Sequence, residues 1–206
     1  MARFVFVSAL ALAALLSLGS FNSMQGAGVV ITLEPNIKYQ TISGWEATAE
    51  VGQNDSAAFP KYKDQLYDLA VNDLGINRLR VEIKSGAENP TDYFAQYQNP
   101  ATRPSEAEMR KHVYEIINDN ADPNVINPDG FHFSELDSEM ENIVLPMKQR
   151  LQARGEKLLI NLNYIDFGSS PFEHKDHPEE YAEFVLSTYQ HLQNKYGIVP
   201  DAWEVI

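Results

Sequence analysis

The feature that most constrains this fold is a regular alternation of helical and strand-like segments, in which a glycine closes each helix. Three segments carry apolar residues at helical spacing: 60–74, 134–154 and 178–196. The glycines that follow them are Gly75, Gly155 and Gly197. Strand-like runs come next at 76–83, 157–165 and 201–206. Because helices that connect neighbouring strands leave those strands parallel, we expect an α/β fold built from βα units.

The segments that precede the first helix also have strand character. VVITLEPN, residues 29–36, is rich in β-branched residues, and QTISGWEA, residues 40–47, follows it. In the long helix over 134–154, Ser134 is the expected N-terminal cap and Pro146 is expected to produce a kink.

The strands carry charged and amide side chains on one face, which distinguishes between two kinds of parallel sheet. In INRLRVEI, Leu79, Val81 and Ile83 alternate with polar residues. In KLLINLNYI, Asn161 and Asn163 share the face opposite the leucines. Strands of a doubly wound sheet are buried on both faces and are apolar throughout, whereas the inner face of a (β/α)8 barrel is polar near its carboxyl ends. The pattern therefore favours a TIM barrel.

A complete barrel needs eight strands, and only about four βα units are visible here. The chain is therefore expected to be the first half of a barrel, as part of a longer sequence. Residues 84–133, rich in Asn, Pro and Asp, interrupt the alternation. We interpret them as one long loop with its own helical patch near 105–117, on the face where barrel loops shape substrate clefts.

The first 27 residues have the layout of a secretory signal peptide. Arg3 precedes an apolar stretch from Phe4 to Leu18, and small and polar residues follow. The stretch is short for a membrane span, although a single N-terminal anchor helix is the alternative. We therefore expect a secreted, extracellular protein whose main domain covers residues 28–206.

Charge and cysteine content limit the partners. The chain has 16 basic and 29 acidic residues, for a net charge of −13, and it has no cysteine. Such a surface repels nucleic acids and anionic membranes, so neither is expected as a partner, and no obligate protein partner is expected. Without disulfides, the domain must rely on its core.

Four stretches carry a family resemblance: YQTISGWEAT, LGINRLRVEI, NLNYIDFGSSP and DAWEVI. Together they resemble the retaining (β/α)8 glycoside hydrolases, and family 30 of the O-glycosyl hydrolases is the most similar. The chain departs from that family at Gly44-Trp45-Glu46, where the family usually has Gly-Phe-Gly.

The resemblance implies a carbohydrate substrate, hydrolysis by two glutamates, and no metal or cofactor. It implies that residues 29–36 belong to a side β-sandwich, and that Arg80 supports the nucleophile. It also implies that the acid/base follows the fourth strand and the nucleophile ends the seventh, so that both lie beyond residue 206. No residue of this chain is therefore assigned a catalytic role, including the strand carboxylates Glu46, Glu82 and Glu204, and the fragment alone is expected to be inactive.

Six residues are expected to contact the sugar: Trp45, Glu46, Arg80, Asn163, Tyr164 and Asp166. Aromatic rings stack on sugar rings, and amide and carboxylate groups bond to hydroxyls. Core packing remains the alternative for Trp45 and Tyr164, and loop capping for Asn163 and Asp166.

Two further hypotheses stay open. The segment EHKDHPEE could suggest a metal site from Glu173, His174, Asp176 and His177, but acidic residues are also favoured where a helix begins. The alternative to an enzyme is a non-catalytic secreted carbohydrate-binding protein on a barrel-like fold.

Overall fold

The computed structural model describes residues 30–168 and 170–205. They divide into two units at Thr41, and the second unit, which begins at Ile42, contains all the strands and helices of the described chain. The expected signal peptide and Ile206 lie outside the described residues.

The expected strand over 29–36 is not formed in its described part, residues 30–36. The chain turns at Pro35 and Asn36, and the backbone N–H of Ile37 donates to the carbonyl of Glu34 at 3.0 Å. Val30 and Ile31 are 87% and 79% exposed, so these β-branched residues are not part of a core. The sequence prediction was wrong here because a strand is stable only with a hydrogen-bonded neighbour, and the described residues provide none.

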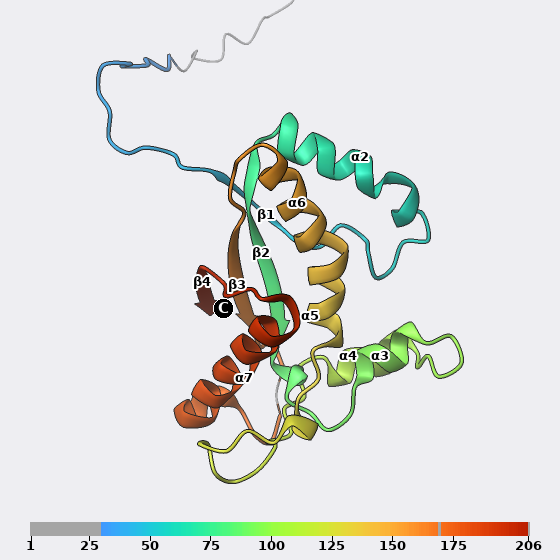
Figure 1. Cartoon of the computed structure of the whole chain (residues 1–206). Helices are drawn as coiled ribbons and strands as arrows, with labels where there is room; N and C mark the ends of the chain where they lie inside the picture. Colours follow the sequence, from blue (N-terminus) through green and yellow to red (C-terminus); the bar gives the residue numbers. More distant parts are fainter. Residues whose placement is uncertain (1–29, 169, 206) are drawn as a thin grey trace, which may run out of the picture. The chain divides into compact units, whose positions relative to one another are not determined.

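Four parallel strands form one sheet in sequence order, β1-β2-β3-β4 (Figure 1). They are β1 (Trp45–Thr48), β2 (Ile76–Lys84), β3 (Leu159–Ile165) and β4 (Ala202–Val205). The predicted α/β class and the parallel βα repeat are therefore confirmed. β1 is shorter than the run that predicted it, since residues 42–44 have no strand structure.

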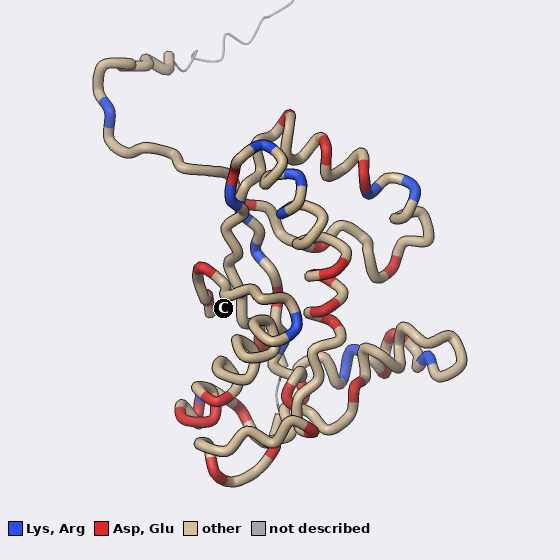
Figure 2. Tube along the Cα trace, viewed as in Figure 1, with Lys and Arg blue, Asp and Glu red and all other residues tan. Residues whose placement is uncertain are grey.

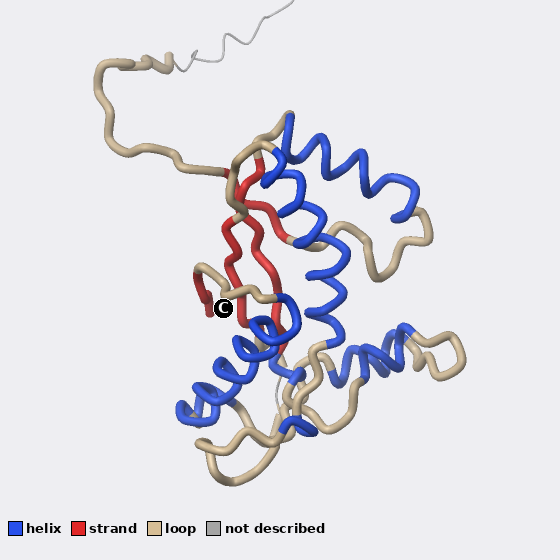
Figure 3. Tube along the Cα trace, viewed as in Figure 1, coloured by secondary structure: helices blue, strands red, loops and turns tan. Residues whose placement is uncertain are grey.

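Helices connect the strands (Figure 3), and they end within two residues of the predicted positions. α2 (Phe59–Asn72) joins β1 to β2, and α7 (Pro178–Tyr196) joins β3 to β4. Between β2 and β3, one helix is built from α5 (Ser134–Glu139), the π-helical turn η3 (Met140–Val144) and α6 (Leu145–Ala153). Gly75, Gly155 and Gly197 have φ values of 69°, 74° and 64°, the left-handed conformation that ends a helix.

The predicted kink at Pro146 takes the form of the π-helical turn that immediately precedes it. Proline has no N–H to donate to the carbonyl of Asn142, four residues earlier. The hydroxyl of Tyr67, from α2, donates to that carbonyl instead. Ser134 does not cap the helix as predicted, because Phe133 occupies the cap position and the Ser134 hydroxyl donates to Asp92 at 2.7 Å.

One face of the sheet packs on the helices and forms the hydrophobic core. Leu79, Val81 and Ile83 of β2 are each at most 2% exposed. Leu162 of β3 lies beside Val81, and Phe184 of α7 is fully buried in the same cluster. This burial supplies the main stabilisation of a chain without disulfides.

The long segment between β2 and α5 contains two short helices and two 3₁₀ turns. These are η1 (Ser85–Ala87), α3 (Tyr93–Gln98), α4 (Glu106–His112) and η2 (Pro128–Gly130). Ser105 caps α4 by accepting from the N–H of Glu108 at 3.2 Å. The rings of Tyr93 and His112 stack at 3.9 Å between centroids and join α3 to α4. The predicted helical patch near 105–117 is therefore real but shorter.

Acidic residues outnumber basic ones on α7 and in the segment between β2 and α5, whereas α2 carries two of each (Figure 2). No helix within residues 30–168 and 170–205 combines the length and apolar character that a membrane crossing requires.

Candidate functional site

The second face of the sheet is polar, and the strand register aligns its side chains in rows. Arg80 lies beside Asn161 in the β2–β3 pair, and Glu82 lies beside Asn163. Glu204 of β4 continues the second row beside Asn163. Because neighbours in register point to the same side of a sheet, these residues form one polar face.

Arg80 and Asn163 make the closest contact of this polar face. With the Asn163 amide oxygen turned toward Arg80, it accepts from Nε at 2.9 Å and from Nη2 at 2.6 Å. Asn163 is fully buried, and Glu82 lies 3.8 Å from the same Nη2. The amide of Asn161 also joins the two rows, since it donates to Glu204 at 2.9 Å. The guanidinium is therefore fixed in one orientation by a two-point contact.

At the carboxyl end of β2 the polar face continues into a cluster of acidic groups around one lysine. The ammonium group of Lys84 contacts Glu135 at 2.5 Å and Glu50 at 3.9 Å. Burial alone would lower the pKa of Lys84, but these two carboxylates raise it above its usual value. Lys84 therefore remains a cation.

Two glutamates next to this lysine, the half-buried Glu82 and the buried Glu139, have raised pKa values. Burial raises the pKa of Glu82, and the nearby charge of Glu50 raises it further. Burial also raises the pKa of Glu139 well above its usual value, although its Oε2 accepts from the N–H of Glu82 at 3.0 Å. Both groups therefore favour the protonated form more than an exposed glutamate does.

A cleft of about 700 Å³ opens beside this cluster. Glu50 lines it from the loop after β1, Lys84 from β2 and Glu135 from α5. Tyr97 and Arg103 line it from the segment between β2 and α5. The guanidinium of Arg103 lies 4.7 Å from the centre of the Tyr97 ring. The cleft thus combines both charges with an aromatic ring, next to the carboxyl ends of β1 and β2.

The structure places Trp45 and Glu46 at the opposite end of the sheet. They are the first two residues of β1, and Trp45 is 58% exposed. Glu46 forms an ion pair with Arg78, its neighbour in the register of β2. Trp45 is therefore not brought together with Arg80 and Asn163, whereas Glu46 lies one row before Arg80, because the register pairs Glu46 with Arg78 and Thr48 with Arg80.

Tyr164 lies on the apolar face rather than the polar one. It is 4% exposed, its ring contacts Tyr181 and Phe184, and its hydroxyl bonds to Nδ1 of His174 at 2.8 Å. Burial raises its pKa, and the nearby charge of Asp166 adds to this. This position corresponds to the core-packing alternative, and the ring is not accessible for stacking on a sugar.

Asp166 lies just past β3 and organises the loop that follows. Its Oδ1 accepts from the hydroxyl of Ser85 at 3.1 Å and from the N–H of Gly168 at 3.3 Å. These contacts correspond to the loop-capping alternative. Asp166 still lies at the carboxyl end of the sheet, close to the end of β2.

The four residues singled out in EHKDHPEE, Glu173, His174, Asp176 and His177, do not assemble a metal site. His174 bonds through Nε2 to Glu88 at 2.6 Å, Glu173 pairs with Lys175, and His177 stacks on Phe172. Within the described residues, the group whose ligand atoms come close enough for a metal is Asp119, Glu180 and Glu183.

Sequence reasoning missed two features of this region. One is the buried chain from Tyr164 through His174 to Glu88, which joins β3 to the segment after β2. The other is the group of Asp119, Glu180 and Glu183, of which only the three-residue spacing of the two glutamates was visible in the sequence.

No family model matches this chain, and neither a curated protein nor a solved structure matches it significantly. The chemistry of the site therefore rests on its residues. The polar face carries groups of both charges beside two buried amides, and the adjoining cleft adds the partly exposed ring of Tyr97.

Proposed function

We propose that the polar face of this sheet and the adjoining cleft bind a carbohydrate, as part of a secreted retaining glycoside hydrolase with a (β/α)8 barrel. The observation that carries the proposal is the two-point contact of Arg80 on Asn163 within a polar face of parallel strands. A parallel sheet that is apolar on one face and polar on the other is typical of a barrel, whose inner face leads to the active site.

The cleft supports the same proposal. Loops that follow barrel strands surround the active site, and the segment after β2 contributes Tyr97 and Arg103 to the cleft. Hydroxyl groups of a sugar both donate and accept, so they match a site where Lys84 donates and Glu50 and Glu135 accept. We assign sugar binding to this carboxyl end of the sheet.

The proposed mechanism needs two carboxyl groups about 5 Å apart, one as acid/base and one as nucleophile. Glu46 is paired with Arg78, and Glu204 accepts from Asn161, so each is held by a structural partner. We propose that both catalytic glutamates lie outside these 206 residues and that this chain alone binds a sugar without cleaving it.

A binding assay with a matched pair of arginine variants tests the proposal. The folded chain is titrated in a calorimeter with neutral oligosaccharides of β-1,3-, β-1,4- and β-1,6-linked glucose, xylose and N-acetylglucosamine. We expect saturable binding of at least one of them. Arg80→Lys, which keeps the charge but loses the two-point contact, should weaken that binding at least tenfold.

Arg150→Lys is the control. Like Arg80, Arg150 donates through two nitrogens, in its case to the carboxylates of Asp64 and Asp68 on α2. It should leave the affinity unchanged. Absence of binding to every sugar by a folded chain, or equal effects of the two variants, would contradict the proposal. Release of reducing sugar by the chain alone would contradict the assignment of both catalytic glutamates to residues outside it.

A further inference from the structure

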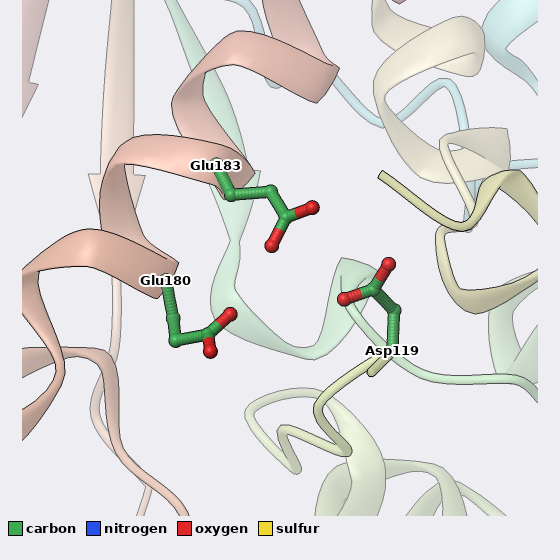
Figure 4. A group of neighbouring side chains, drawn as sticks. All are labelled: Asp119, Glu180 and Glu183. Carbon is green, nitrogen blue, oxygen red and sulfur yellow. The ribbon is translucent and has the colours of Figure 1, made fainter. Parts of the chain in front are cut away.

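Three carboxylates from two distant segments converge beside the amino-terminal part of α7 (Figure 4). Asp119 comes from the segment between β2 and α5, and Glu180 and Glu183 come from α7. One oxygen of each lies within 4.8 Å of the others. Two ligands on opposite sides of a calcium ion, each at 2.3–2.6 Å, would be separated by about this distance.

Asp119 is held in place by its own loop. Its Oδ2 accepts from the N–H of Asn127 at 2.6 Å and from the amide of Asn120 at 2.9 Å. Its backbone N–H donates to Glu88 at 3.1 Å, and a Cβ on Gly130 would lie only 2.3 Å from the Asp119 Cβ. The loop thus fixes the carboxylate through Oδ2, and Oδ1 remains available to another partner.

The helix dipole can account for Glu180, which lies in the first turn of α7, but not for Glu183. Stabilisation of acidic residues by the dipole is confined to the first turn, and Pro178 begins α7, so Glu183 lies beyond that turn. Glu179, in the same first turn, is exposed, whereas Glu183 is only 3% exposed. Residues three apart lie on one side of a helix, so Glu180 and Glu183 both face Asp119 (Figure 4).

Each of the three carboxylates has one buried oxygen without a donor from the described part of the chain. These atoms are Oδ1 of Asp119, Oε2 of Glu180 and Oε1 of Glu183. A buried carboxylate oxygen without a partner is costly, and three together carry mutual repulsion in addition. The other nearby carboxylate, Glu88, is already paired with His174.

We propose that Asp119, Glu180 and Glu183 bind a hard divalent cation of the calcium class. Carboxylate oxygens are the ligands that such ions prefer, and the ion would partner all three oxygens at once. The site would tie the segment between β2 and α5 to α7, 61 residues apart in the sequence. It is independent of sugar binding at the polar face.

The experiment uses the full chain, freed of metal with EDTA and dialysed. We expect calcium chloride, at about 100 times its Kd, to raise the Tm by about 5 °C or more. Magnesium chloride and sodium chloride at matched ionic strength should give smaller shifts. Terbium(III), which substitutes for calcium in oxygen sites, should show luminescence sensitised by aromatic excitation, because Tyr181 lies between the two glutamates in the sequence.

Glu183→Gln should abolish both the calcium shift and the terbium signal, while the metal-free variant remains at least as stable as the wild type. Glu179→Gln, on the same turn but exposed, should keep both responses, and so should Glu139→Gln, a buried glutamate elsewhere. Absence of any Tm shift with calcium, magnesium or manganese would overturn the proposal. A proton shared among the carboxylates would then explain their close approach. A calcium shift that survives in Glu183→Gln would also overturn it.

Discussion

The side-chain amide of the fully buried Asn163 holds the guanidinium of Arg80 at two points, with Nε at 2.9 Å and Nη2 at 2.6 Å from its oxygen. The contact joins β2 to β3 on the polar face, where the register places Glu82 and Glu204 on either side of Asn163. It orients the arginine toward the region to which we assign sugar binding.

Asn163→Ala should therefore lower the free energy of unfolding by about 1–3 kcal/mol, because Arg80 keeps its partly buried charge but loses its acceptor. Urea denaturation measures this. Asn124→Ala, at an exposed loop position, is the control and should change the free energy by less than about 0.5 kcal/mol. Equal effects of the two substitutions would show that the contact does not contribute to stability.

A second prediction concerns Tyr67, whose hydroxyl donates to the carbonyl that Pro146 leaves without a helical partner. Tyr67→Phe should cost about 1–2 kcal/mol of unfolding free energy, since this carbonyl loses its donor. In a Pro146→Ala background the backbone N–H is restored, so the cost of the same substitution should shrink. A double-mutant cycle measures this coupling. If the two effects are additive, the Tyr67 hydroxyl does not replace the backbone N–H that Pro146 lacks.

The buried chain from His174 to Glu88 gives a third prediction. Glu88 is 1% exposed and accepts from His174 at 2.6 Å and from the N–H of Asp119 at 3.1 Å. Glu88→Ala should destabilise the protein by about 3 kcal/mol or more, because it leaves buried partners unpaired. Glu108→Ala, which breaks an exposed contact with Lys111, should cost less than about 1 kcal/mol. Thermal or urea unfolding of both variants compares these costs.

Glu139 predicts a pH dependence of stability. Its pKa is raised in the folded protein by burial, although Lys84 nearby opposes the effects of Glu135 and Glu50. A carboxyl with a raised folded pKa binds its proton more tightly in the folded state, so its contribution to stability is complete below the unfolded pKa. That contribution is lost as the pH rises toward the folded value.

The free energy of unfolding of the wild type should therefore fall, relative to Glu139→Gln, as the pH rises from about 4.5 to 7. Urea denaturation at several pH values gives both profiles. Parallel profiles for the two proteins would show that Glu139 does not titrate differently in the folded and unfolded states.

Local patterns in the sequence were enough to predict most of the sheet. The alternation in residues 76–83 and the glycines after each helix predicted β2 and the helix ends closely, because period and backbone conformation are local properties. The strand expected over 29–36 failed in its described part, because strand formation also depends on a partner that a propensity cannot supply.

The candidate site was predictable only in part. Parity along β3 separates Asn163 from Tyr164, which shares its face with Leu162, so the buried position of Tyr164 was available from the sequence. The contact between Arg80 and Asn163 needed the register of two strands 83 residues apart. The approach of Asp119 to α7 depends on the path of a long segment, which no periodicity encodes.

The central claim, sugar binding at the polar face, is tested most directly by nitrogen-15 NMR of the folded chain during titration with the neutral oligosaccharides. We predict shifts of the Arg80 Nε–H, of the Asn163 side-chain amide and of the backbone amide of Lys84, with the Arg150 Nε–H unchanged. Unchanged Arg80 and Asn163 resonances at saturating sugar, or shifts confined to the amino end of the sheet around Trp45, would contradict the claim.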